Sequence, residues 1–99
     1  MTEWHFSQPK NIAVLADMRF IRHMTPCLYV SHDYDDGGWQ FLASDTNGDP
    51  GNVLVVALST AVSVDPTLNE IADLPEGWIA TRIAVGAAWQ RMQHPKLEE

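Results

Sequence analysis

The chain has a single cysteine, few cationic residues and no long apolar run. One thiol cannot form an intrachain disulfide, so we expect Cys27 to be a reduced thiol, as in the cytoplasm. No segment approaches the ~20 apolar residues that a membrane helix requires, and the N-terminus has no basic region followed by an apolar stretch. The sequence therefore predicts a cytoplasmic protein that has no membrane partner.

Positive charge is scarce as well. Six Lys and Arg residues stand against thirteen Asp and Glu residues, and the formal net charge is −7. Such a chain repels a phosphate backbone, so we expect no nucleic-acid partner. The same charge attracts a basic protein and raises its rate of association, which makes a basic protein the favoured kind of partner.

The composition is sufficient for one domain with its own core. The chain has 99 residues, of which 45% are hydrophobic, and needs no disulfide or structural metal to fold. We expect a single α+β domain, mainly an antiparallel sheet with one or two short helices. Residues 1–9 and 93–99 are expected to be flexible ends, the first of which would pack only through Trp4 and Phe6.

Alternating apolar residues predict the first strands. The two-fold pattern over residues 12–21 predicts a strand, with a short helix over residues 11–18 as the alternative. Residues 27–42 predict an antiparallel hairpin, because two β-branched and aromatic runs flank the acidic glycine turn at residues 33–38. This hairpin is the strongest structural signal in the sequence.

The second half of the chain has clear signals for where strands and helices begin and end. Residues 53–58 lack alternation, as does a strand covered on both faces, and predict a strand followed by a short helical turn; a helix to residue 62 is the alternative. Asp65 and Pro66 predict a helix start, because an aspartate accepts hydrogen bonds from free backbone N–H groups and proline suits the first helical position. Residues 78–92 predict a second hairpin that turns at Gly86.

Two acidic loops suggest a cation site, but their spacing does not fit an EF-hand. Counted from Asp33, position 5 is Gly37 and position 12 is Ser44. Counted from Asp45, position 6 is Pro50 instead of the required glycine. We therefore expect no metal and no cofactor. A small-molecule or metal-ion binding module that uses these Asp/Asn/Gly loops is the alternative function.

No catalytic constellation is recognisable, so we predict that the chain is not an enzyme. Cys27 and His32 are five positions apart, which places them on opposite sides of a strand and prevents a nucleophile pair. His32 is expected to lie half-exposed at a strand end, with its ring bonded to the turn. The tryptophans of the predicted strands are expected in the core, with exposure as binding anchors as the alternative: Trp39, Trp78 and Trp89.

An ordered set of residues resembles a known family. The set comprises Leu28-Tyr29-Val30, Gly38-Trp39-Gln40-Phe41, Leu58 followed by Val64-Asp65-Pro66, and Leu74-Pro75-x-Gly77 followed by Ala80 and Arg82. It covers roughly residues 12–85 and resembles a family of small bacterial domains of unknown biochemistry, some of which are grouped with the immunity proteins of polymorphic toxin systems. The chain resembles a divergent member of this family, because Ser31-His32-Asp33 and Gly37 replace the family's usual residues. The resemblance implies no catalytic residue.

Together these features predict a non-catalytic, immunity-like protein-binding domain. Its binding surface is expected at the tip of the first hairpin, where acidic and aromatic residues gather: Asp33, Tyr34, Asp35, Asp36 and Trp39. The sequence leaves open the oligomeric state, including whether the strand at residues 53–58 is an edge that pairs with a second copy.

Overall fold

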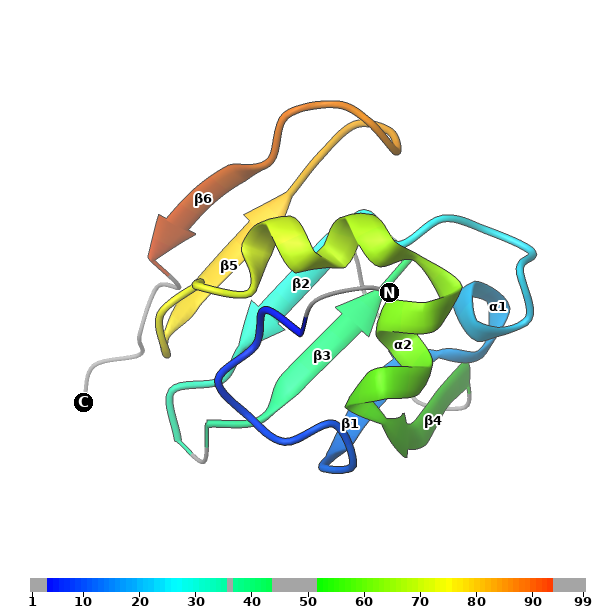
Figure 1. Cartoon of the computed structure of the whole chain (residues 1–99). Helices are drawn as coiled ribbons and strands as arrows, with labels where there is room; N and C mark the ends of the chain where they lie inside the picture. The colour runs from blue at the N-terminus through cyan, green and yellow to red at the C-terminus, as the bar shows by residue number, and fades with distance from the viewer. Residues whose placement is uncertain (1–3, 36, 44–51, 94–99) are drawn as a thin grey trace.

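One six-stranded sheet carries the fold in the computed structural model, which describes residues 4–35, 37–43 and 52–93. The strand order is β4-β1-β3-β2-β5-β6 (Figure 1). Neighbouring strands are antiparallel except β1 and β3, which are parallel. This architecture confirms the α+β class. The strands are β1 (Ala13–Asp17), β2 (Tyr29–His32), β3 (Trp39–Leu42), β4 (Val53–Ala57), β5 (Trp78–Thr81) and β6 (Gln90–Gln93).

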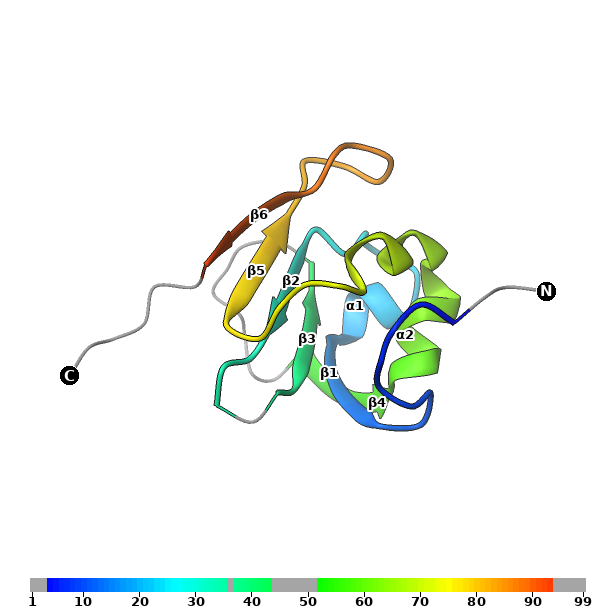
Figure 2. The ribbon, with the colours of Figure 1, turned by 60° about the vertical axis from the view of Figure 1, so that its left-hand side comes forward.

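The helical segments are short and lie on one side of the sheet. Within the described ranges they are α1 (Met18–Ile21), α2 (Leu58–Val64) and the 3₁₀ helix η2 (Pro66–Ile71). Figures 1 and 2 show α1 and α2 on the same face of the sheet. Between helices and sheet lies the core, which includes Val14, Val30, Phe41, Leu58, Leu68, Ile71 and Ala80. None of the helices in the described part of the chain is long and apolar enough to cross a membrane.

The first strand is shorter than its sequence pattern suggests. β1 ends at Asp17, and residues 18–21 form α1, so the prediction of a strand to residue 21 is wrong beyond Asp17. The reason is local capping, because the carboxylate of Asp17 accepts a hydrogen bond from the backbone N–H of Arg19 at 2.8 Å. Phe20 is therefore buried as a residue of helix α1 and not as a residue of a strand.

Both predicted hairpins are present. β2 pairs with β3 in the register that sets Val30 opposite Phe41 and His32 opposite Trp39. β5 pairs with β6, and Gly86, at φ +92°, lies in the connection between them. Asp65 caps η2 as predicted, since its side chain accepts from the backbone N–H of Thr67.

β4 and α2 follow one another as predicted, but β4 is not covered on both faces. It is the terminal strand of the sheet, and Val55 at its centre is 68% exposed. The missing alternation therefore reflects a partly exposed edge with apolar side chains on both faces.

The N-terminal segment packs on the sheet. Phe6 is 4% exposed and meets Trp39 edge-on, with 5.1 Å between ring centroids. The indole N–H of Trp4 donates to the carbonyl of Gln8 at 2.8 Å. Residues 4–9 thus cover part of the core through Trp4 and Phe6, whereas residues 1–3 and 94–99 lie outside the described part of the chain.

Candidate protein-binding site at the hairpin tip

The connection between β2 and β3 is closed by backbone hydrogen bonds. The N–H of Asp33 donates to the carbonyl of Gly38 at 2.7 Å, and the N–H of Gly37 donates back to Asp33 at 3.1 Å. Gly37 has φ +71°, in the left-handed region that glycine tolerates best. These hydrogen bonds tie Asp33, at one end of the turn, to Gly37 and Gly38 at the other.

The carboxylate of Asp33 is held in place by two neighbours on the sheet. The hydroxyl of Ser31 donates to it at 2.8 Å, and the side-chain amide of Gln40 donates at 3.0 Å. Its negative charge also reaches Tyr29: burial raises the pKa of that phenol, and the charge of Asp33 raises it further. Asp33 is thus an ordered carboxylate in an electronegative corner of the sheet.

A second segment, just before β5, joins the tip. The N–H of Gly77 donates to the carbonyl of His32 at 2.7 Å, which fixes this segment beside β2. The ring of Tyr34 lies against Gly77, where an added Cβ would be 3.6 Å from it. Glu76 lies against the turn itself, since a Cβ added at Gly37 would come within 2.7 Å of its Oε2. No signal in the sequence placed Glu76 in this site.

We define the acidic tip as Asp33, Tyr34, Asp35 and Glu76. The connections that carry these residues lie at the same end of the sheet (Figure 1). Tyr34 is 56% exposed, and both Asp35 and Glu76 are exposed. The ion pairs in the described ranges use other acids, namely Asp17 with Arg19, Asp65 with Arg82 and Asp73 with Arg91. Asp36 was also expected here but lies outside the described residues.

Trp39 is the expected site residue that the structure removes from the surface. It is 1% exposed and stacks on His32, with 4.0 Å between ring centroids. His32 is also buried, and its Nδ1 lies 2.7 Å from the carbonyl oxygen of Leu74, so the expected half-exposed ring is wrong. Because the two residues pair across β2 and β3 on the helix-covered face, both belong to the core.

The described residues offer no cluster suited to a metal or a reactive thiol. No group of three or more His, Cys, Asp or Glu side chains within the described ranges could hold a metal ion. The second acidic loop, at residues 44–51, lies outside those ranges. Burial raises the pKa of the Cys27 thiol to about 12, so it stays protonated at neutral pH.

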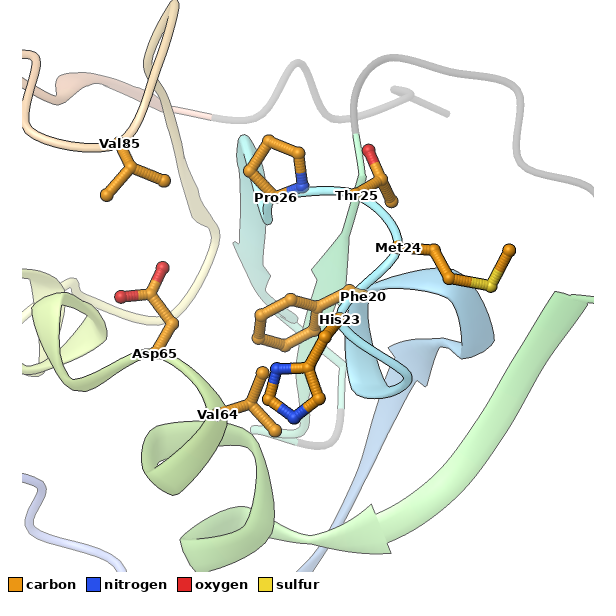
Figure 3. Close-up of a pocket in the computed structure, with 8 residues that line it drawn as sticks. All are labelled: Phe20, His23, Met24, Thr25, Pro26, Val64, Asp65 and Val85. Atoms are coloured by element: carbon orange, nitrogen blue, oxygen red, sulfur yellow. The ribbon is translucent and has the colours of Figure 1, made fainter.

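A pocket of about 350 Å³ opens near α1, at the position shown in Figure 3. Its one carboxylate, from Asp65, already accepts from the backbone N–H of Thr67 and from Arg82. The pocket therefore offers mostly apolar walls beside a single imidazole, a set that does not form a catalytic pair. The lining residues are Phe20, His23, Met24, Thr25, Pro26, Val64, Asp65 and Val85.

No family model, curated protein or solved structure matched this chain. The resemblance to immunity-related domains therefore stays a prediction. The residues on which the resemblance rests have structural roles. Val30, Trp39 and Phe41 are buried, and Asp65 is bonded to Arg82. Such residues specify a fold. In the sequence, most residues of the acidic tip lie between them.

Proposed function

We propose that this chain is a non-catalytic, immunity-like protein-binding domain of the cytoplasm, and that the acidic tip binds a basic protein. The observation that carries the proposal is that Glu76 lies against Gly37, in the same turn as Asp33 and Asp35, while the exposed ring of Tyr34 lies against Gly77. None of these acids takes part in an ion pair within the described ranges. Their charge is therefore available to a partner.

The tip is organised before binding. Ser31 and Gln40 already hold the carboxylate of Asp33, and backbone hydrogen bonds close the turn. A partner arginine or lysine that binds this carboxylate has little ordering entropy to overcome on this side of the interface. Tyr34 adds an apolar ring with a polar end, a residue type that often dominates binding energy.

The net charge of −7 acts over a longer range and in the same direction. It raises the rate of encounter with a basic surface and makes that rate fall with ionic strength. A partner recruited in this way is released by moderate salt.

Affinity capture from the native cytoplasm tests the proposal. We expect the chain to retain a basic protein that elutes at moderate salt. The variant Glu76→Lys should associate with that protein at least about tenfold more slowly, because charge reversal at the tip replaces attraction with repulsion.

Glu70→Lys is the matched control. Glu70 is exposed and undergoes the same charge reversal, but it lies on η2, outside the acidic tip. We expect this control to slow association by less than about threefold, through net charge alone. Equal slowing by the control and the tip variant would contradict the tip as the binding site. Failure to retain any basic protein would contradict the proposed function.

A further inference from the structure

β4 is an edge strand whose outer side has no partner in the described part of the chain. It pairs with β1 over all five residues, and no other described strand is paired with it. The opposite edge of the sheet is β6. Unpaired N–H and C=O groups along an edge are a template for another strand.

The direction of the backbone N–H and C=O groups along β4 shows which of them point away from β1. The N–H of Leu58 donates to the carbonyl of Ile12 at 2.9 Å, so Leu58 points its backbone groups toward β1. Because these directions alternate along a strand, Leu54 and Val56 also point toward β1. The backbone groups of Val53, Val55 and Ala57 then point to the free edge.

The two edges differ in their chemistry. β4 has the sequence Val-Leu-Val-Val-Ala, with no charge and no proline, and Val55 is 68% exposed. β6 has the sequence Gln-Arg-Met-Gln, and its Arg91 is bonded to Asp73 and to the carbonyl of Glu70. Soluble proteins usually protect edges with charged residues, proline or bulges, and β4 has none of these.

We propose that β4 pairs antiparallel with β4 of a second copy of this chain, about a two-fold axis at Val55. In this register Val55 meets Val55 of the other copy, Leu54 meets Val56, and Val53 meets Ala57. Each pair keeps its two side chains on the same face, because residue parity is conserved. The open backbone groups of Val53, Val55 and Ala57 are those that such a register bonds.

The absence of charge on β4 favours a second copy as the occupant. A basic partner gains nothing at β4, where there is no acid to neutralise, whereas a second copy brings a strand that is equally neutral and apolar. The acidic tip stays apart from this contact, because β1 and β3 separate β2 from β4 in the sheet (Figure 1). The like charges of the two acidic tips therefore do not meet at the pairing strands.

Sedimentation equilibrium between about 1 µM and about 1 mM tests the proposal, because a short strand contact gives a weak interface. We expect the mass to rise with concentration from 11.1 kDa toward twice that value. Val55→Lys should remain monomeric across this range, since it sets two ammonium groups face to face at the axis. Val55→Thr, which keeps the branched side chain without charge, is the matched control and should still associate.

Amide hydrogen exchange on the wild-type chain gives a second measurement that needs no variant. Protection of Val53, Val55 and Ala57 should increase with concentration, while that of Gln90 to Gln93 on the other edge should not. Added salt should strengthen self-association by screening the −7 charge of each copy, whereas it weakens binding at the acidic tip. The two proposals can therefore fail independently.

Two results would overturn this inference. One is a monomer at about 1 mM in high salt with no change in exchange at β4. The other is a dimer that Val55→Lys leaves intact, which would place the contact elsewhere.

Discussion

The guanidinium of Arg82 lies 2.7 Å from the carboxylate of Asp65, in an ion pair whose arginine side chain is fully buried. The same guanidinium donates to the carbonyl of Cys27 and to the hydroxyl of Thr67. The ring of Trp89 lies over it at 4.2 Å. Arg82 therefore ties the end of β5 to the start of η2 and to the segment that enters β2.

Replacement of Arg82 by methionine should be among the most destabilising single changes in the chain. It keeps much of the apolar stem but removes the donors of the Cys27 carbonyl and leaves the carboxylate of Asp65 without its cation, with only Thr67 still donating to it. We expect the free energy of unfolding to fall by about 3–5 kcal/mol, the usual cost of removing one member of a buried ion pair. Urea denaturation measures this directly.

Arg22→Met is the control for that experiment, because Arg22 is exposed. Its effect should stay within about 0.5 kcal/mol. Arg82→Lys should fall between the two, since lysine retains the charge but not the planar fork that serves three acceptors. A value for Arg82→Met as small as that for Arg22→Met would contradict the role assigned to the pair.

Asp17 predicts a dependence of stability on acid pH. Hydrogen bonds from the guanidinium of Arg19 hold the pKa of Asp17 below its ordinary value of 3.8, although partial burial opposes them. A lowered carboxyl pKa stabilises the folded state above about pH 4, and this contribution is lost as the pH falls through the folded pKa. Arg19 is 51% exposed, so the contribution should be no more than about 1 kcal/mol.

Asp17→Asn isolates this charge, because asparagine keeps the oxygen that caps α1. Urea denaturation at pH 7 should show the variant to be less stable by up to about 1 kcal/mol, and the difference should shrink as the pH falls below about 4 and through the folded pKa. A difference that persists unchanged at pH 2 would show that the charge of Asp17 is not its cause.

His23 occupies a backbone position that favours glycine. It has φ +62° just after α1, where its N–H donates to the carbonyl of Phe20 and the N–H of Met24 donates to Arg19. The left-handed conformation costs an L-residue about 1–2 kcal/mol, against about 0.5–1 kcal/mol for the added flexibility of glycine in the unfolded chain. We expect His23→Gly to stabilise the fold by up to about 1 kcal/mol.

His23→Ala is the matched variant, because alanine also lacks the imidazole but keeps the Cβ that causes the strain. It should show no gain in thermal denaturation. If alanine stabilised the chain as much as glycine did, the benefit would come from removing the imidazole, and the strain argument would be wrong.

Local signals predicted those elements that local chemistry fixes. The hairpin over residues 27–42 follows from two alternating runs around a glycine turn, and the start of η2 follows from Asp65 and Pro66. The error at residue 17 was a competition between alternation and capping, in which the hydrogen bond to Asp17 prevailed. The alternation of apolar residues carries no information about that hydrogen bond.

The candidate site was predicted only in part. Asp33, Tyr34 and Asp35 gather because they share one turn, which the sequence shows directly. Trp39 adjoins that turn in sequence but points into the core, and Glu76 belongs to the tip although it is far away along the chain. Both outcomes depend on which face of the sheet the helices cover and on which strand pairs with β2.

The sequence by itself determined the acidic charge, the class of fold, the two hairpins and the cap of η2, because each depends on composition or on neighbours along the chain. The strand order, the parallel pairing of β1 with β3, the free edge at β4 and the ion pair of Arg82 with Asp65 were decided by the tertiary structure alone. These features join residues that are distant in sequence, and their energies arise only when the packed core has brought those residues together.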